Sequence, residues 1–262
     1  DMLSFFRRKK TIGLVLSGGG LRGIGHLGVL KALEDYNIKP DMIAGTSAGA
    51  IVGAFYAMGN SPDVIIDKLP VLQFFGFSAF RLRRYAVFTP QMFYPLFKTF
   101  LPEDDFGALK IPLYVTATNI VTGKTQFFSE GPLFEPLIAS ASIPFIFPVA
   151  TVKQEHFLDG GIINNLPVEI LQGRCDKLIG VHVNAIAPGK QLVPTGRQLF
   201  DRIVHLSINN NVYNKAHLCD LFIDPPEMTR FSMFDKKQGR AIFDHCYTYT
   251  KELLQSKAIS IT

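Results

Sequence analysis

The feature that most constrains the fold is a strand–turn–helix unit that occurs twice near the start of the chain. The apolar run Thr11–Leu16 leads into the turn Gly18-Gly19-Gly20-Leu21-Arg22-Gly23, and the run Met42–Ala44 leads into Gly45-Thr46-Ser47-Ala48-Gly49. Two segments with helical spacing of apolar residues follow these turns, Leu21–Asp35 and Ala48–Met58. Short apolar strands that alternate with helices predict a mostly parallel sheet covered on both faces, because such strands are buried on two sides.

The rest of the chain continues this alternation. Strands are expected at Ile111–Ala117, Val121–Ser129 (a hairpin return), Ala150–Val152, His156–Leu158, Leu178–Val183 and Cys219–Ile223. Helices are expected at Leu133–Ser140, Pro167–Leu171, Gly196–His217 and Lys237–Gln255. No repeat or linker interrupts the pattern, so we expect one α/β domain over residues 11–262 after an N-terminal tail of residues 1–10.

The composition is consistent with a buried core, and the cysteines indicate a reducing compartment. Of the 262 residues, 47% are hydrophobic and 19% are charged, which is too apolar for a disordered chain. The three cysteines, Cys175, Cys219 and Cys246, are scattered without a CxxC spacing, which argues against a disulfide framework and against a zinc site. We therefore expect a reducing, cytoplasmic location.

The charge of the chain leaves contact with a membrane surface open. A net charge of +5 favours anionic surfaces such as phospholipid headgroups or nucleic acid, although a soluble enzyme with surplus lysines has the same composition. No apolar run approaches the ~20 residues of a membrane span, and Ile12–Leu16 is too short for a signal peptide. Leu3, Phe5 and Phe6, beside the basic cluster Arg7–Lys10, could contact a membrane peripherally or form a solvated tail.

The first glycine turn is compatible with two kinds of site. It satisfies the GxGxxG pattern of a dinucleotide site, and its backbone N–H groups could equally form an oxyanion hole. A dinucleotide site needs an acidic residue at the end of the second strand to bind the ribose. Here Asp41 stands at the beginning of that strand, at the wrong edge of the sheet, so we favour the oxyanion hole and expect no cofactor.

The second glycine turn has the GxSxG form of a nucleophile elbow. Gly45 and Gly49 flank Ser47 between a strand and a helix, an arrangement that projects the serine oxygen above the sheet. If the first two strands are neighbours, both turns face one crevice, and free N–H groups surround Ser47 where an ester carbonyl would become an oxyanion. Two structural glycine turns with an idle serine are the alternative interpretation.

A serine nucleophile needs a proton acceptor, for which the candidate is Asp159 in the segment Phe157-Leu158-Asp159-Gly160-Gly161. A carboxylate with a pKa near ~4 is a weak base, but burial raises its pKa. That burial could come from the apolar neighbours of Asp159, which are Phe157, Leu158, Ile162 and Ile163. An ordinary Asp-Gly turn remains the alternative.

With these three motifs in this order, the chain resembles the patatin-like phospholipases over about residues 11–185. Softer similarities are Ala141-Ser142-Ile143-Pro144, Pro148, Asn165 and Pro167. The resemblance implies a three-layer α/β/α sandwich with a mostly parallel central sheet, and hydrolysis of acyl esters of phospholipids, lysophospholipids or glycerides without a metal. It also implies a dyad without histidine, in which Ser47 is the nucleophile and Asp159 is the base.

The same resemblance assigns the remaining site residues. The oxyanion region is assigned to Gly18, Gly19, Gly20 and Arg22. Supporting turn positions are assigned to Gly23, Gly45, Gly49, Gly160 and Gly161. A Ser–His–Asp triad remains the alternative mechanism, and His182, near the carboxyl end of a strand, is its best histidine. Of the others, His26 is expected to pack or hydrogen-bond beside the glycine loop, and His156 to face away from Asp159.

Residues 70–101 form an aromatic segment whose role is open. Its eight phenylalanines are Phe74, Phe75, Phe77, Phe80, Phe88, Phe93, Phe97 and Phe100, interrupted by Arg81, Arg83 and Arg84. The segment could form a lid or an acyl-pocket wall that meets lipid, or a helical subregion that fills its own core.

The expected partner is a lipid or ester substrate, with no nucleic acid, and the oligomeric state is open. Two other functions are compatible with the motifs. One is acyl transfer through the same acyl-serine intermediate, and the other is a catalytically silent lipid-binding protein.

Overall fold

The computed structural model describes residues 10–69, 93–144, 146–185, 206, 209, 211–231 and 238–256. Three segments named above lie outside these residues: the N-terminal tail, residues 70–92 of the aromatic segment, and most of the helix expected at 196–217. Within the described part, no helix combines the length and the hydropathy needed to cross a membrane.

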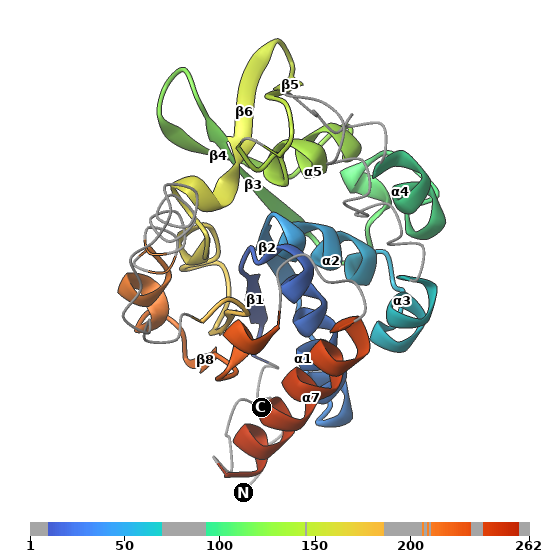
Figure 1. The fold of residues 1–262 in the computed structure, drawn as a ribbon, viewed down its shortest axis with the longest axis vertical. Coiled ribbons are helices and arrows are strands. Elements are labelled where there is room, and N and C mark those ends of the chain that lie inside the picture. Colours follow the sequence, from blue (N-terminus) through green and yellow to red (C-terminus); the bar gives the residue numbers. More distant parts are fainter. Residues whose placement is uncertain are drawn as a thin grey trace, which may run out of the picture.

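An eight-stranded mixed sheet forms the centre of the molecule (Figure 1). The strands are β1 Ile12–Leu16, β2 Met42–Thr46, β3 Leu113–Asn119, β4 Lys124–Phe128, β5 Ala150–Val152, β6 Glu155–Asp159, β7 Lys177–Val181 and β8 Leu221–Ile223. Their order is β5-β6-β3-β2-β1-β7-β8, and β4 pairs with β3 off this path. The run β3-β2-β1-β7-β8 is parallel, whereas β4 and β6 are antiparallel to β3, and β5 is antiparallel to β6. The predicted parallel centre is confirmed.

Helices cover both faces of this sheet. The α-helices are α1 Gly25–Asp35, α2 Ala48–Ala57, α3 Pro62–Lys68, α4 Tyr94–Phe100, α5 Phe134–Ser140 and α7 Gly239–Ser256. Short 3-10 turns are η1 Gly20–Ile24, η5 Phe106–Ala108, η6 Gly160–Ile162, η7 Val168–Ile170 and η8 Met228–Arg230. The helix expected at 167–171 is therefore only a 3-10 turn, and the first predicted helix begins with one. Residues 211–216 are helical as expected.

Alternate residues of β1 enter two different cores. Leu14 and Leu16 belong to the larger core, together with side chains of α1, α2, α4, α5 and α7. Val15 belongs to a smaller core on the opposite face, where it meets Leu166 and Val212. This two-residue period is what a strand buried on both faces requires. The result is an α/β/α sandwich.

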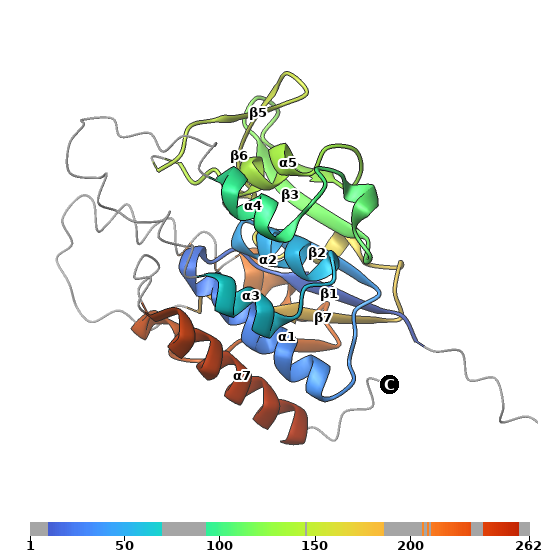
Figure 2. The same cartoon turned by 90° about the vertical axis from the view of Figure 1, so that its right-hand side faces the viewer.

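The closing helix α7 lies alongside α1 (Figure 2). Gly28 makes this close packing possible, because a Cβ atom at that position would collide with the carbonyl oxygen of Phe243. The α1–α7 pair therefore joins the C-terminal end of the chain to the helix that follows the first glycine turn.

The described end of the aromatic segment belongs to the larger core. Phe93, Phe97 and Phe100 are all buried, and the Phe100 ring packs 4.5 Å from that of Phe55 on α2, measured between ring centroids. These three rings fill the larger core of the domain, and a lid or acyl-pocket wall in the segment stays a prediction. The rings and arginines of residues 70–92 lie outside the described part of the chain.

Candidate active site

The candidate nucleophile and base meet because β2 and β6 share one edge of β3. β3 pairs with β4 over 115–119, with β2 over 113–116 and with β6 over 117–119. Since β4 occupies one edge, β2 and β6 follow one another along the other edge. Thr46, the last residue of β2, pairs with Thr116, and Asp159 ends β6 opposite the next residue, Ala117. The two strands run in opposite directions, so their carboxyl ends converge and bring Ser47 to Asp159.

Ser47 sits in a strained turn that neighbouring groups hold in place. Its φ of 54° and ψ of −124° are unfavourable for a residue with a side chain. Its N–H donates to Ser140 Oγ at 2.7 Å, and Ser140 Oγ donates to the Thr116 carbonyl at 2.6 Å. A Cβ atom on Gly49 would collide with the Leu16 carbonyl oxygen, so the turn requires glycine there. This geometry matches the nucleophile elbow expected from the sequence.

Asp159 is a buried carboxylate with an altered affinity for protons. Burial raises its pKa from 3.8 to about 6, against the opposing effect of hydrogen bonds from the Ser47 hydroxyl and the Gly161 N–H. The Gly161 bond is 2.7 Å long. Phe157 is buried as expected, but Ile162 and Ile163 are 38% and 37% exposed, so these two contribute less to the burial than we expected.

The loop that follows Asp159 approaches the sheet closely. A Cβ atom on Gly160 would collide with the Thr116 carbonyl oxygen and lie 3.0 Å from Thr46 Cγ2. Glycine at this position therefore lets the loop pass over β3 and reach β2. The same loop turns back on itself through Asn164, whose N–H donates to the Gly160 carbonyl at 2.8 Å.

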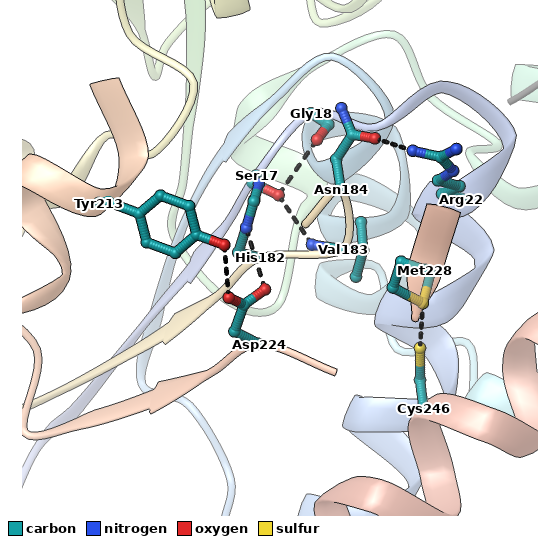
Figure 3. Close-up of polar contacts among 10 residues, drawn as sticks. All are labelled: Ser17, Gly18, Arg22, His182, Val183, Asn184, Tyr213, Asp224, Met228 and Cys246. Carbon is teal, nitrogen blue, oxygen red and sulfur yellow. Dashed lines mark hydrogen bonds and ion pairs between the residues drawn. The ribbon is translucent and has the colours of Figure 1, made fainter. Parts of the chain in front are cut away.

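The glycine loop packs directly against the nucleophile turn. An ideal Cβ atom on Gly18 would lie 3.1 Å from Ser47 Cβ, and one on Gly23 would collide with Ala48 Cβ. The Gly18 N–H donates to Asn165 Oδ1 at 3.0 Å. The Gly18 carbonyl accepts from Ser17 Oγ at 3.1 Å (Figure 3). Because the Gly18 N–H already has an acceptor, it is not a candidate donor to the oxyanion. The remaining candidates in this loop are the N–H groups of Gly19 and Gly20.

The Arg22 side chain connects the glycine loop to distant segments by hydrogen bonds. Its side chain is buried, with Nε donating to the Phe231 carbonyl at 2.9 Å and Nη1 donating to Asn184 Oδ1 (Figure 3). Both acceptors lie far along the chain, in segments that the sequence left without a role. These bonds give the Arg22 guanidinium a structural task, and its place in the oxyanion region stays a prediction.

Asn164 and Asn165 connect the three motifs, and sequence reasoning gave neither a role. The Asn164 carbonyl accepts from Thr46 Oγ1 at 2.9 Å, next to the nucleophile. Asn165 holds the glycine loop through Gly18, as described above. The only sequence signal for this connection was the resemblance noted at Asn165 and Pro167.

His182 has an acidic partner but not the geometry of a triad with Ser47. Its Nδ1 lies 3.1 Å from Asp224 Oδ1, and the Tyr213 hydroxyl donates to Asp224 Oδ2 at 2.8 Å (Figure 3). It follows β7, which β1 separates from β2 and the nucleophile turn. Within the described residues no hydrogen bond joins it to Ser47, so the geometry favours the dyad.

The other histidine near the glycine loop is structural. His26 is fully buried, and its Nε2 lies 2.7 Å from the Ser17 carbonyl oxygen. Burial, with a smaller contribution from the nearby His182, lowers its pKa to about 4 against the opposing effect of the Ser17 bond. A neutral ring that donates to Ser17 fits this position, as expected for a residue that packs beside the loop.

His156 is exposed on β6. In the described ranges no three His, Cys, Asp or Glu side chains gather as a metal-ligand set.

Comparisons with known proteins identify the family of the chain. The family model for patatin-like phospholipases matches residues 14–171. A lysophospholipase (nte1) of Emericella nidulans is 28% identical over an alignment that covers 94% of this chain and 18% of that protein. A lysophospholipase (NTE1) of Eremothecium gossypii is 35% identical over 189 residues, which cover 68% of this chain and 12% of that protein.

Solved structures show the same fold at lower identity. VipD from Legionella pneumophila superposes with a TM-score of 0.55 at 17% identity, over 95% of this chain and 67% of that one. The chain spans less than a fifth of the length of the two lysophospholipases, so it corresponds to one part of such proteins. The family match covers all three motifs and more than half of the chain. The chain therefore belongs to the patatin-like phospholipase family.

Proposed function

We propose that this chain hydrolyses acyl esters of lipids through an acyl-enzyme on Ser47, with Asp159 as the base. The observation that carries the proposal is the convergence of the ends of β2 and β6, which brings Ser47 to Asp159, a buried carboxylate whose pKa is raised to about 6. A serine in a strained elbow beside such a base has the two parts that nucleophilic catalysis needs. The family and the names of the relatives support lipids as the substrate class, and lysophospholipids as the first to test.

The proposed reaction begins with Asp159 ionised. At neutral pH a carboxyl group with a pKa of about 6 is mostly ionised, yet it is more basic than an exposed aspartate. It takes the proton of Ser47 as the serine oxygen attacks the ester carbonyl. The N–H groups of Gly19 and Gly20, with those of the first turn of α2, are the candidate donors to the oxyanion. The proton then passes to the leaving alcohol.

The second half-reaction repeats these steps with water. Asp159 removes a proton from a water molecule that attacks the acyl-serine, the same donors hold the second tetrahedral intermediate, and Ser47 leaves with the proton as the fatty acid is released. Each step moves one proton through Asp159, so its protonation state controls both halves.

The test compares wild type and Ser47→Ala on lysophospholipid, phospholipid, diacylglycerol and short-chain ester substrates. We expect wild-type turnover on at least one lipid and none above background for Ser47→Ala. Ser61→Ala serves as a matched control, because Ser61 only caps α3 by accepting from the Val64 N–H. Activity that Ser47→Ala leaves intact would overturn the proposal.

Two further arms separate the alternatives. A wild-type protein that binds lipid vesicles but turns over no ester and does not react with a fluorophosphonate would be a silent lipid-binding protein. Transfer of the acyl group to an added alcohol, in place of release as fatty acid, would identify an acyltransferase.

A further inference from the structure

The Asn165 side chain has one partnered end and one unpartnered end beside the dyad. The side chain is 1% exposed, and its Oδ1 accepts from the Gly18 N–H at 3.0 Å. Its Nδ2 is buried and has no hydrogen-bond partner among the described residues. A buried donor without a partner is destabilising, so buried amides are normally paired at both ends.

The orientation of this amide is fixed by its neighbour. The Gly18 N–H is a donor and needs an oxygen, so an amide flip that exchanged Oδ1 and Nδ2 would set two donors against each other. The unpaired group is therefore the donor Nδ2.

The amide lies between the two halves of the dyad. Its Oδ1 is 2.6 Å from an ideal Cβ on Gly18, and that Cβ is 3.1 Å from Ser47 Cβ. On the other side, Oδ1 is 2.8 Å from an ideal Cβ on Gly161, and that Cβ is 3.0 Å from Asp159 Oδ1. Glycine at both positions therefore lets the Asn165 amide lie next to Ser47 and Asp159.

The preceding residue shows what a purely structural asparagine looks like in this loop. Asn164 is equally buried, but its Oδ1 accepts from Lys215 Nζ at 2.7 Å and its Nδ2 donates to Glu169 Oε1. Two adjacent asparagines with the same burial thus differ in one respect, the unpaired donor of Asn165.

From this geometry we infer that Asn165 is a substrate-contacting residue of the hydrolytic site. Its Nδ2 donates a hydrogen bond to an oxygen of the tetrahedral intermediate on Ser47, while its Oδ1 holds the glycine loop through Gly18. The inference rests on the proposed function, because it assigns a partner to that same intermediate.

The test uses two substitutions that separate the two ends of the amide. Asn165→Asp keeps an oxygen for the Gly18 N–H and removes the donor, whereas Asn165→Ala removes both. We expect kcat to fall by about 10²–10³-fold in both variants, the loss typical of one oxyanion donor, with KM within about threefold of wild type. Asn119→Asp is the matched control, a buried asparagine on β3 with partners at both ends, and should keep its kcat.

Two results would overturn the inference. If Asn165→Asp keeps kcat within about threefold while Asn165→Ala loses it, the side chain acts only through Gly18. If the loss in Asn165→Asp recovers at alkaline pH, the new charge has merely raised the pKa of Asp159. Both outcomes leave the proposed function standing when Ser47→Ala is inactive. Equal turnover by wild type and Ser47→Ala would instead remove the proposed function and this inference together.

A measurement on the wild-type protein covers the case in which the variants fail to fold. Reaction of Ser47 with a fluorophosphonate leaves a tetrahedral phosphonyl group that resembles the intermediate. The side-chain amide protons of Asn165 should then move downfield in the ¹H–¹⁵N NMR spectrum, as expected for a new hydrogen bond. An unchanged Asn165 signal in the phosphonylated protein contradicts the inference.

Discussion

Replacing Asp159 by Asn should abolish hydrolysis and also raise the free energy of unfolding at neutral and alkaline pH. The asparagine side chain can still accept from the Gly161 N–H through Oδ1, so the loop keeps its shape. The substitution removes the free-energy cost of burying an ionised carboxylate at this position. Function and stability therefore respond in opposite directions to the same substitution.

The size of the effect follows from the pKa of Asp159. Its rise from 3.8 to about 6 means that the folded protein binds the proton more tightly than the unfolded chain does. The stabilisation by the protonated form is fully present below the unfolded pKa and is lost as pH rises through the folded pKa. At about 1.4 kcal/mol per unit, this loss approaches 3 kcal/mol above about pH 7, and roughly half of it develops between about pH 5 and pH 8.

The assay is urea unfolding at these two pH values, followed by far-UV circular dichroism because the chain contains no Trp. The stability of Asp159→Asn relative to wild type should increase by about 1.4 kcal/mol from about pH 5 to pH 8. Asp67→Asn, at an exposed carboxylate on α3, is the control and should show no such trend. A difference that stays constant or shrinks as pH rises would refute the argument that burial destabilises the Asp159 carboxylate.

Four shorter predictions test other parts of the structure. The kcat/KM of the wild type should rise with pH to a plateau, with a midpoint at about pH 6, because Asp159 must be ionised to act as the base; a flat profile across that range contradicts this role. His182→Ala should retain turnover in the folded protein, and loss of turnover without unfolding would favour a triad. Ser140→Ala leaves the N–H of the nucleophile turn without its acceptor, so it should lower stability by about 1–3 kcal/mol and reduce kcat; unchanged values in urea unfolding and steady-state assays would show that the turn holds itself. Gly28→Ala should destabilise the protein by about 1–3 kcal/mol in thermal unfolding by forcing α1 away from α7, with the KM of the folded protein unchanged.

Much of the site was predictable because it depends on short local patterns. The elbow at Ser47 requires small residues in a tight turn between a strand and a helix, and that requirement is visible in the sequence as Gly45 and Gly49. The parallel centre of the sheet was predictable for a similar reason, since β1, β2 and β7 each contain a short run of apolar residues. Residues whose constraint is local can be identified from the sequence alone.

The approach of Asp159 to Ser47 was not predictable from local patterns. It depends on β6 pairing with the same edge of β3 as β2, which is a matter of long-range register. The hydrogen bonds from Arg22 to Asn184 and Phe231 have the same origin, because both acceptors come from distant segments.

The expected contribution of Ile162 and Ile163 to burial failed for a related reason. Apolar character in a sequence predicts a tendency to be buried, but the fold decides which side chains of a loop face the interior. These two residues follow the glycines on the outer side of the loop and are more than one third exposed.

The central claim, that Ser47 is the nucleophile activated by Asp159, is tested most directly by mapping covalent labelling with a fluorophosphonate. Wild type should gain one phosphonyl group, located by peptide mass spectrometry on the peptide that contains Ser47. Asp159→Asn should react far more slowly, and Ser47→Ala should not react. A label on another residue, or equally fast labelling of wild type and Asp159→Asn, would contradict the claim.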